Sequence, residues 1–479
     1  MRRGLTFRQM TVGLLFGALA VFACLMPAVG DTFWHLRAGQ EIWRTLHVSL
    51  VDQYSYTVAG GYWPDHEWLW QAFSYGLYHV GGMRFLVFGS ACLVVGASAI
   101  LYRLCVGPPS VRLVLFLLSL PLATRAWVLR PQLVSTLALA VFLWLLVHER
   151  HRWLPPLFVV WANAHGGVAM GIAVLAAVAA VAILRARRGD ERDRRRALAL
   201  ALVAPLCLLA TLLTPLGLDL WRTIGMSIAL ARENQILEWQ PTWPDGPFGI
   251  IFWSLALGFL ALLVRRRHRL RGMSWGDIVL LTASLVTLVL AARAIRNTCV
   301  FLLIAIPATS RLLGADFRLG RGGAPDAAAT DHPRINLALL VGVSAVEVSA
   351  VLFAWHVAYA GLGWQPISPG AVAAARACPA QLFGRYNDGG PLIWFVPDKR
   401  VFSDTRHDPY PRAITRESSS IEHGGPYRET FARYGIQCAI LPVTSPAAVR
   451  LAGDGWQSRF RDDAWTVLVA PKAAGSGPS

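Results

Sequence analysis

The chain has 479 residues, of which 55% are hydrophobic and only 15% are charged. Soluble domains carry about a quarter charged residues, so this composition excludes an ordinary soluble protein and predicts one that crosses a membrane several times. The formal net charge of +17 does not indicate nucleic-acid binding, because the arginines cluster in short loops between apolar segments.

The order of the apolar segments predicts a polytopic α-helical membrane protein with about 11 transmembrane helices. The first covers about residues 10–29, and Arg2, Arg3 and Arg8 before it place the N-terminus in the cytoplasm. Counting the passes from there puts the basic loops on the cytoplasmic side, at residues 103–112, 148–152, 185–196, 265–269 and 311–334. The polar motifs lie in the loops that remain, so they face outward.

Two domains are predicted from the change of composition near residue 360. Residues 1–360 form the transmembrane domain, and residues 31–83 are its first outer loop. Residues 361–472 form a small extracytoplasmic α/β domain, and 473–479 a disordered tail. The short apolar runs of the second domain predict strands at 392–396, 438–441 and 465–469.

The seven cysteines show no zinc-type spacing. Five lie in or beside apolar segments and are interpreted as small core residues. Cys378 and Cys438 lie in the predicted α/β domain. They form a disulfide only if that domain is in an oxidising compartment, and the sequence leaves this open.

The first outer loop begins with a candidate catalytic pair, Asp31 and His35. They are four residues apart, which places them on one face of a helix. A carboxylate near a low-dielectric boundary binds protons more tightly, so the pair suits a base with its partner, or two metal ligands. The structural alternative is that Asp31 only caps the helix.

A second polar cluster, Asp65, His66 and Glu67, lies about thirty residues further on. Asp65 and Glu67 could join Asp31 in holding a divalent metal, Mg²⁺ or Mn²⁺, because carboxylates are ligands that these ions prefer. The alternative is the ordinary polarity of a surface loop.

Four arginines lie at outer ends of predicted helices: Arg125, Arg130, Arg293 and Arg296. Arginine within a span costs about 2.5 to 3.5 kcal/mol at mid-bilayer and less near the interface. Because guanidinium binds phosphate in bidentate fashion, a lipid phosphate is the expected partner. Snorkelling to ordinary headgroups is the alternative.

Asn163 and His165 stand beside Gly166 and Gly167, inside the long apolar run 154–184. Basic residues flank this run on both sides, which predicts two short passes with the break on the outer side. A broken helix can line a polar cavity. His165 either contacts a ligand there or is a satisfied core histidine.

Together these features resemble the GT-C superfamily of integral membrane glycosyltransferases that use polyprenyl-phosphate-linked sugars. More narrowly, the chain is similar to a group of bacterial membrane proteins of that kind. The motifs that carry the likeness are Asp31-Thr-Phe-Trp-His35-Leu, Asp65-His-Glu-Trp-Leu, Arg130-Pro-Gln132, Trp161-Ala-Asn163-Ala-His165-Gly-Gly, Glu238-Trp239, Arg293-Ala-Ile-Arg296, Tyr386-Asn-Asp-Gly-Gly390 and Val401-Phe-Ser-Asp-Thr-Arg406.

The resemblance implies a GT-C-like fold with Asp31 as the catalytic base or a metal-binding residue. Many members carry two adjacent acids there, whereas this chain has Gly30-Asp31-Thr32, so the second acid would be Asp65 or Glu67. Gln132 and Glu238 join the substrate-binding candidates.

The activity implied is inverting transfer of a sugar from a polyprenyl-phosphate donor to a hydroxyl acceptor. It would take place at the outer face of the bacterial cytoplasmic membrane. The main alternative is a non-catalytic membrane subunit that binds lipid or glycan within a larger assembly. A transporter is less favoured, because the cytoplasmic halves of the helices are apolar.

Overall fold

The computed structural model describes residues 4–233, 236–319, 332–406 and 408–471. Arg2, Arg3, much of the predicted 311–334 linker and the predicted disordered tail lie outside these ranges. The chain divides into two compact units. The helical unit comprises Met1–Pro27 and Gly81–Val357, and the α/β unit comprises Ala28–Val80 and Ala358–Ser479.

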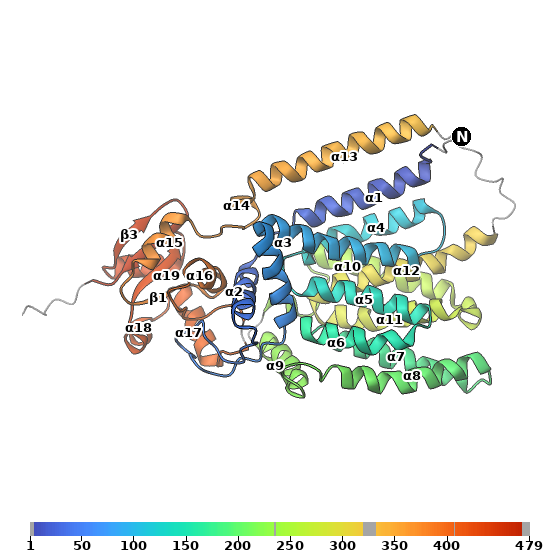
Figure 1. The fold of residues 1–479 in the computed structure, drawn as a ribbon, viewed down its shortest axis with the longest axis horizontal. Helices are drawn as coiled ribbons and strands as arrows, with labels where there is room; N and C mark the ends of the chain where they lie inside the picture. Colours follow the sequence, from blue (N-terminus) through green and yellow to red (C-terminus); the bar gives the residue numbers. More distant parts are fainter. Residues whose placement is uncertain (1–3, 234–235, 320–331, 407, 472–479) are drawn as a thin grey trace, which may run out of the picture. The chain divides into compact units, whose positions relative to one another are not determined.

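The helical unit is built from long apolar helices that pack in pairs such as α7–α8, α11–α12 and α1–α13 (Figure 1). Its helices are α1 (Phe7–Cys24), the later part of α3 (Trp68–Leu104), α4 (Pro109–Ala123), α5 (Gln132–Val147), α6 (Leu154–Ala164), α7 (Val168–Ala186), α8 (Glu191–Ala210), α9 (Asp219–Glu233), α10 (Gly246–Arg265), α11 (Trp275–Arg293), α12 (Thr298–Leu319) and α13 (Pro333–His356). Short 3-10 helices join them: η1 (Thr124–Ala126), η2 (His151–Trp153), η3 (Leu237–Trp239), η4 (Arg267–Gly272) and η5 (Ile295–Asn297).

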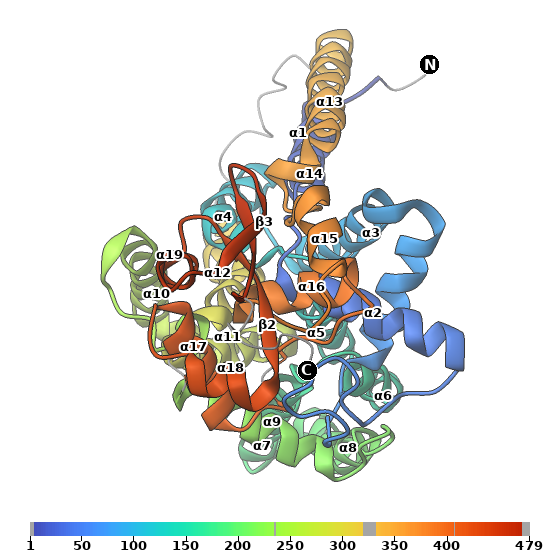
Figure 2. The same cartoon turned by 90° about the vertical axis from the view of Figure 1, so that its left-hand side faces the viewer.

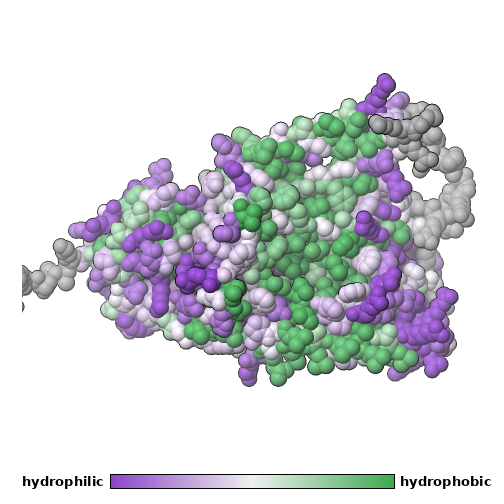
Figure 3. Space-filling view, viewed as in Figure 1, coloured by the Kyte–Doolittle hydropathy of each residue, from purple (hydrophilic) through white to green (hydrophobic). Residues whose placement is uncertain are grey.

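Among the described residues, eight helices are long and apolar enough to cross a membrane. A helix also occupies each of the other predicted passes: α5, α6 and α8. The count of 11 passes therefore stays a prediction, while the multi-pass membrane class is confirmed. On the face seen in Figure 3, hydrophobic side chains cover much of the surface of the helical unit, as expected for a surface that faces lipid.

Helices α1 and α13 lie side by side because α1 offers two small residues one turn apart, Gly13 and Gly17 (Figure 1). Leu340 packs at Gly13, where a Cβ would be 2.9 Å from its Cδ1 atom. The Glu347 carboxylate packs at Gly17. This is the small-xxx-small pattern that lets membrane helices approach closely.

Helix α3 is broken at Gly81 and Gly82, where the chain passes from the α/β unit into the helical unit. Gly82 has φ +64° and ψ −155°, a conformation that only glycine adopts readily. The predicted break in the 154–184 run is also confirmed: α6 ends at Ala164, and α7 begins at Val168.

The α/β unit contains a four-stranded sheet in the order β1-β2-β4-β3, with β1 and β2 parallel and the other pairs antiparallel. Its strands are β1 (Gln381–Phe383), β2 (Ile436–Pro442), β3 (Gln457–Arg461) and β4 (Trp465–Val469). Its helices are α2 (Gly30–Thr45), the start of α3, α14 (Ala358–Gly361), α15 (Pro369–Arg376), η6 (Tyr386–Asp388), α16 (Gly389–Phe395), α17 (Arg412–Glu422), α18 (Arg428–Tyr434) and α19 (Pro446–Gly453).

Two of the three strand predictions are confirmed, at 438–441 and 465–469, but the third is wrong. Residues 392–396 are largely helical, in α16. A short apolar run cannot distinguish a buried strand from a buried helix. Here Gly390 lies against the carbonyl of Gly30, and this close approach packs α16 onto α2.

The sheet lies between two layers of helices, as Figure 2 shows for α15 and α16 on one side and α17, α18 and α19 on the other. Alternation along β2 sets the two cores: Cys438 and Ile440 face the first layer, and Ala439 and Leu441 the second. Side chains alternate between the faces of any strand, so four consecutive apolar residues are what a sheet buried on both faces requires.

Residues 28–80 complete this unit. Trp34, Ala38 and Trp63 belong to its first core. The backbone of Tyr54 and Tyr56 pairs with Val401, through Val401 N–H to Tyr54 C=O at 2.9 Å and Tyr56 N–H to Val401 C=O at 3.1 Å. The sequence assigned residues 31–83 to the transmembrane domain; in the structure, Ala28–Val80 belong to the compact α/β unit.

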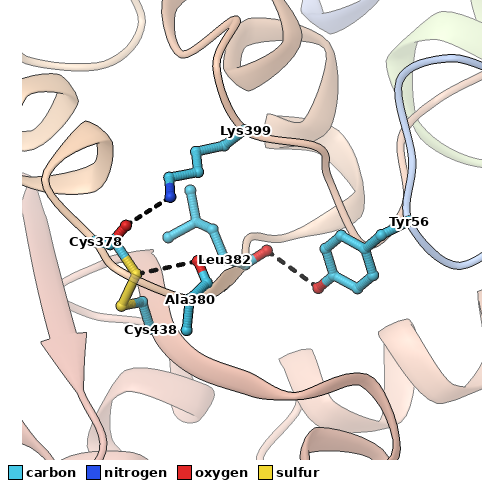
Figure 4. Close-up of a disulfide and its surroundings, with 6 residues drawn as sticks. All are labelled: Tyr56, Cys378, Ala380, Leu382, Lys399 and Cys438. Carbon is cyan, nitrogen blue, oxygen red and sulfur yellow. Dashed lines mark hydrogen bonds between the residues drawn. A yellow bond between two sulfur atoms is a disulfide. The ribbon is translucent and has the colours of Figure 1, made fainter.

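Cys378 and Cys438 form a disulfide within this unit (Figure 4). It joins the end of α15 to β2, and Lys399 Nζ donates a hydrogen bond to the carbonyl of Cys378 at 2.6 Å. The bridge thereby fastens one covering helix to the centre of the sheet.

Candidate functional site

Asp31 lies in the first turn of α2, one residue past the start of the helix. The predicted cap is wrong, because Val29 occupies the N-cap position and its N–H donates to Thr32 Oγ1 at 3.0 Å. Asp31 Oδ1 accepts a hydrogen bond from Trp34 Nε1 at 3.3 Å. A carboxylate in a first helical turn is stabilised by the helix dipole.

The start of α2 is fixed by the Tyr386–Gly390 motif. A Cβ on Gly30 would lie 2.8 Å from the carbonyl oxygen of Asn387, so only glycine fits there. Burial raises the pKa of Tyr386 well above its usual value, and the carboxylates of Asp404 and Asp31 raise it further. The phenol therefore stays protonated and is a hydrogen-bond donor within the electrostatic reach of Asp31.

Glu67 lies between two histidines. His35, only 2% exposed, places Nε2 3.6 Å from Glu67 Oε2. His66 Nε2 is 3.7 Å from Glu67 Oε1. Burial lowers the pKa of His66, but the nearby Glu67 and Asp408 carboxylates outweigh it and raise that pKa overall. The structure thus brings His35, His66 and Glu67 together, a grouping that the sequence analysis did not predict.

Asp65 has a different environment from Glu67. Gln71 Nε2 donates to its Oδ1 at 2.6 Å, and the Glu67 N–H donates to the same atom at 3.4 Å. The side chain is buried, and burial raises the pKa of Asp65 to about 6.

A buried ion network joins the two segments of the α/β unit. Arg406 is fully buried, and its Nε and Nη2 form a fork with Asp404 at 2.8 and 2.7 Å. Nη2 also lies 2.7 Å from Asp52 Oδ1. Tyr410 donates to Asp404 at 2.6 Å. The Val401–Arg406 motif therefore includes a structural tie to the first outer loop, a role that sequence reasoning did not assign to Asp52.

In the helical unit, Glu238 bridges two arginines from distant parts of the chain. Its Oε2 lies 3.1 Å from Arg130 Nη1, and its Oε1 3.3 Å from Arg296 Nη1. The Arg296 guanidinium also stacks over the ring of Trp239 at 4.3 Å. The cluster thus places two guanidinium groups beside one carboxylate.

Backbone pairing brings Glu238 to Arg296. The N–H of Ile295 donates to Gln240 C=O, and that of Thr242 to Ala292 C=O, both at 3.1 Å. Because these bonds hold the segment after η3 against the end of α11, the 3-10 helices η3 and η5 become neighbours. The motifs Glu238-Trp239 and Arg293-Ala-Ile-Arg296 are thereby assembled.

The other polar candidates at these helix ends contact other residues than those of the Glu238 cluster. Arg125 is exposed and stacks over Phe248 at 4.7 Å. Arg293 is exposed at the last residue of α11. Gln132 begins α5 and donates to the carbonyl of Ala126 at 3.5 Å.

The break between α6 and α7 holds His165 in a fixed tautomer. Its Nδ1 accepts the Gly167 N–H at 3.2 Å and lies 2.7 Å from Ser135 Oγ, which in turn accepts from Trp161 Nε1 at 2.7 Å. Since Nδ1 is an acceptor, the imidazole is neutral with its proton on Nε2. Ser135 escaped sequence reasoning because one serine in an apolar helix carries no motif.

Asn163 has a structural role at the same break. Its Nδ2 donates to the carbonyls of Val159 and Leu213, both at 2.8 Å. These bonds fasten the end of α6 to the turn after α8.

No family model matches the sequence, and no curated protein matches it. Solved structures do match. AglB, the oligosaccharyltransferase of Archaeoglobus fulgidus, in complex with an inhibitory peptide and a dolichol-phosphate, aligns with a TM-score of 0.55 and 10% identity over 90% of this chain and 69% of AglB. ArnT from Cupriavidus metallidurans bound to undecaprenyl phosphate aligns with a TM-score of 0.52 and 13% identity over 98% of both chains.

The chain has the GT-C fold. Both likenesses span nearly the whole chain, including the helical unit and the α/β unit. The predicted fold class, a polytopic helical protein with a small α/β domain, is therefore confirmed.

A metal was expected on Asp31, Asp65 and Glu67. AglB has also been solved in complex with Zn and sulfate, and that structure aligns with a TM-score of 0.55 and 11% identity over 90% of this chain and 68% of AglB. In the described part of the chain, no three His, Cys, Asp or Glu residues are grouped so as to hold a metal ion. Asp65 is instead engaged by Gln71. The expected three-carboxylate set is not assembled, and no step of the reaction is assigned to a metal.

Proposed function

We propose that this protein is an inverting glycosyltransferase that moves a sugar from a polyprenyl-phosphate-linked donor to a hydroxyl acceptor. The observation that carries the proposal is the pair of arginines, Arg130 and Arg296, joined by Glu238 in a GT-C helical unit. AglB and ArnT, which have this fold, were solved with dolichol-phosphate and undecaprenyl phosphate. This supports a lipid phosphate as the ligand of the arginines.

In the proposed reaction, Asp31 takes the proton from the acceptor hydroxyl as its oxygen attacks the anomeric carbon of the donor sugar. The bond from that carbon to the phosphate oxygen breaks, and the lipid phosphate leaves with the bonding electrons. The guanidinium groups of Arg130 and Arg296 would bind this leaving phosphate, since groups already in place need little reorganisation. Attack opposite the leaving group inverts the anomeric centre.

His35 is a positioning residue in this scheme. It follows Asp31 by one turn of α2, and its contact with Glu67 fixes the ring. In the helical unit, Ser135 and the Gly167 N–H hold the His165 ring at the break between α6 and α7.

The reaction is proposed for the outer face of the bacterial cytoplasmic membrane, with the N-terminus in the cytoplasm and the α/β unit in the periplasm. The disulfide Cys378–Cys438 supports this orientation, because such bonds persist in oxidising compartments. The basic loops support it through the positive-inside rule.

The rival function is a non-catalytic subunit that binds a lipid or a glycan. It would use the arginine cluster but would not need Asp31. A test that measures lipid retention and sugar transfer separately therefore distinguishes the two.

The lipid test is native mass spectrometry of the full chain purified in detergent. Wild type is expected to retain a polyprenyl phosphate, with or without sugar, and Arg296→Ala and Arg130→Ala are expected to lose it. Arg188→Ala, an exposed arginine at the end of α7, is the matched control. Ordinary phospholipid in every variant would contradict the role of the cluster.

The catalytic test uses membranes that contain the retained lipid-linked sugar. Asp31→Asn is expected to keep the lipid but to lower sugar transfer by about 10² to 10⁴-fold, as for loss of a general base. Asp463→Asn, an exposed carboxylate of the same unit, is expected to be fully active. If Asp31→Asn supports normal transfer, the chain is not the proposed enzyme.

A further inference from the structure

A cavity of about 130 Å³ lies in the α/β unit, between the second half of α2 and the loop of residues 47–65. One water needs about 10 to 15 Å³ of such space, so the cavity has room for roughly ten water molecules, or for one small ring compound of similar atom count. The candidate base and the arginine cluster are not part of its wall. The proposed reaction leaves this cavity without a role.

Asp65 supplies a polar group to the cavity. The side chain is only 4% exposed, and it lines the cavity. Gln71 and the Glu67 N–H both bind its Oδ1. Both of these hydrogen bonds use Oδ1, so Oδ2 is the oxygen that the proposal assigns to a ligand.

Apart from Asp65, the charged groups named around the cavity are held in ion pairs. Glu41, on the wall, is paired with Arg37 at 2.9 Å and with Arg44 at 2.8 Å. Behind the opposite wall, the buried Arg406 lies close enough to Asp65 to lower its pKa against the stronger effect of burial. A free anion or cation would therefore gain little from this environment.

The remaining wall combines aromatic rings with amide and hydroxyl groups. Tyr54 and Trp63 form a corner, with ring centroids 5.9 Å apart and planes at 71°. Arg406 already lies over both rings, at 5.0 and 4.8 Å, which disfavours a second cation there. Gln53, at the exposed rim, can both donate and accept hydrogen bonds.

We propose that this cavity binds one neutral sugar residue of a glycan. A sugar ring has apolar C–H faces for the Tyr54–Trp63 corner and hydroxyl groups for Asp65 and Gln53, and it carries no charge. This arrangement of an apolar wall with a few placed polar groups is that of small-ligand sites generally. The proposal does not rest on sugar transfer, since a glycan-binding subunit would use the same site.

The test measures the binding of monosaccharides to the full chain in detergent by saturation-transfer-difference NMR. The probes are the methyl glycosides of glucose, galactose and mannose, and N-acetylglucosamine, with inorganic phosphate and choline as charged probes. At least one sugar is expected to bind saturably in the millimolar range, as befits a ligand of about a dozen heavy atoms. The charged probes are expected not to saturate.

Two variants locate the site. Asp65→Asn keeps the shape of the side chain but loses the charged acceptor, and Gln53→Ala changes only an exposed rim residue. Each is expected to weaken sugar binding about tenfold, the effect of losing one hydrogen bond to a ligand hydroxyl. Asp463→Asn, exposed and far along the chain, is expected to bind as wild type does.

Three results would overturn the proposal: no sugar saturates, phosphate or choline binds better than every sugar, or both the Gln53→Ala and the Asp65→Asn variant bind the sugar as tightly as wild type does. Gln53→Ala keeps the test decisive even if Asp65→Asn fails to fold. Loss of sugar binding together with intact transfer to a non-sugar acceptor would separate this site from the proposed reaction.

Discussion

Arg406 Nη2 lies 2.7 Å from Asp52 Oδ1, and neither side chain is exposed to solvent. The two residues are separated by most of the chain, yet they bind each other inside one compact unit. The segment that carries Asp31 is therefore held by the C-terminal part of the chain, through a charge pair as well as through the apolar core. This relationship gives the first prediction.

Asp52→Asn is expected to destabilise the α/β unit by about 3 kcal/mol, because it leaves part of the Arg406 charge uncompensated in a buried site. The measurement is the midpoint of thermal unfolding of the purified protein, monitored by tryptophan fluorescence. Glu429→Gln breaks an exposed pair with Arg433 and is expected to leave the midpoint unchanged. Equal midpoints for wild type and Asp52→Asn would contradict the role of this pair.

Asp65 is expected to make the stability depend on pH. Its pKa is raised by burial from 3.8 to about 6, so the folded state favours the protonated form. The stability that this gives is present below pH 3.8 and is lost as the pH rises through 6. Asp65→Asn should avoid this loss, gaining on the order of 3 kcal/mol relative to wild type between pH 4 and pH 7.5.

The check on that prediction is the difference in unfolding midpoint between Asp65→Asn and wild type across this pH range. A difference that stays constant would contradict it. Asp463→Asn is the control, because its exposed carboxylate is not buried on folding.

The disulfide predicts a pattern of thiol reactivity. In protein denatured without reductant, a maleimide reagent is expected to label the five free cysteines but not Cys378 or Cys438. Replacing both with serine is expected to cost about 4 kcal/mol, since the bridge closes a loop with a sequence separation of 60. Labelling of all seven cysteines without reductant would contradict both the bridge and the periplasmic orientation that it supports.

Gly17→Leu is expected to disturb the contact between α1 and α13, because a side chain there would collide with Glu347. Overpacking of this kind costs about 2 kcal/mol and should lower the unfolding midpoint in detergent. Gly342→Leu on α13 is the matched control, since a Cβ at that position meets no atom within 4 Å. If both variants unfold alike, close packing at Gly17 is not what holds the helices together.

Local sequence patterns predicted the helices and strands whose formation depends on one physical property. Long apolar runs predicted the membrane helices, because unpaired backbone groups are too costly in lipid. The glycines after His165 predicted the break between α6 and α7. Alternating residues at 438–441 predicted a strand, whereas the equally apolar run 392–396 did not form one.

The candidate sites were less accessible to sequence reasoning, because their partners are far apart in the chain. Glu67 lies near His35 and His66, although the sequence paired His35 with Asp31, and Asp65 binds Gln71 rather than a metal-binding group. Nothing in the sequence linked Glu238 to both Arg130 and Arg296, or assigned Asp52 to Arg406.

The sequence by itself determined that this protein lies in a membrane and has a separate polar domain, because hydrophobicity and charge act locally along the chain. Only the tertiary structure decided that residues 28–80 belong with the C-terminal domain, that Glu238 joins two arginines, and that Asp65 lines a cavity. Such contacts depend on how helices and strands pack, and the pairing of distant residues leaves no periodic pattern in a single sequence.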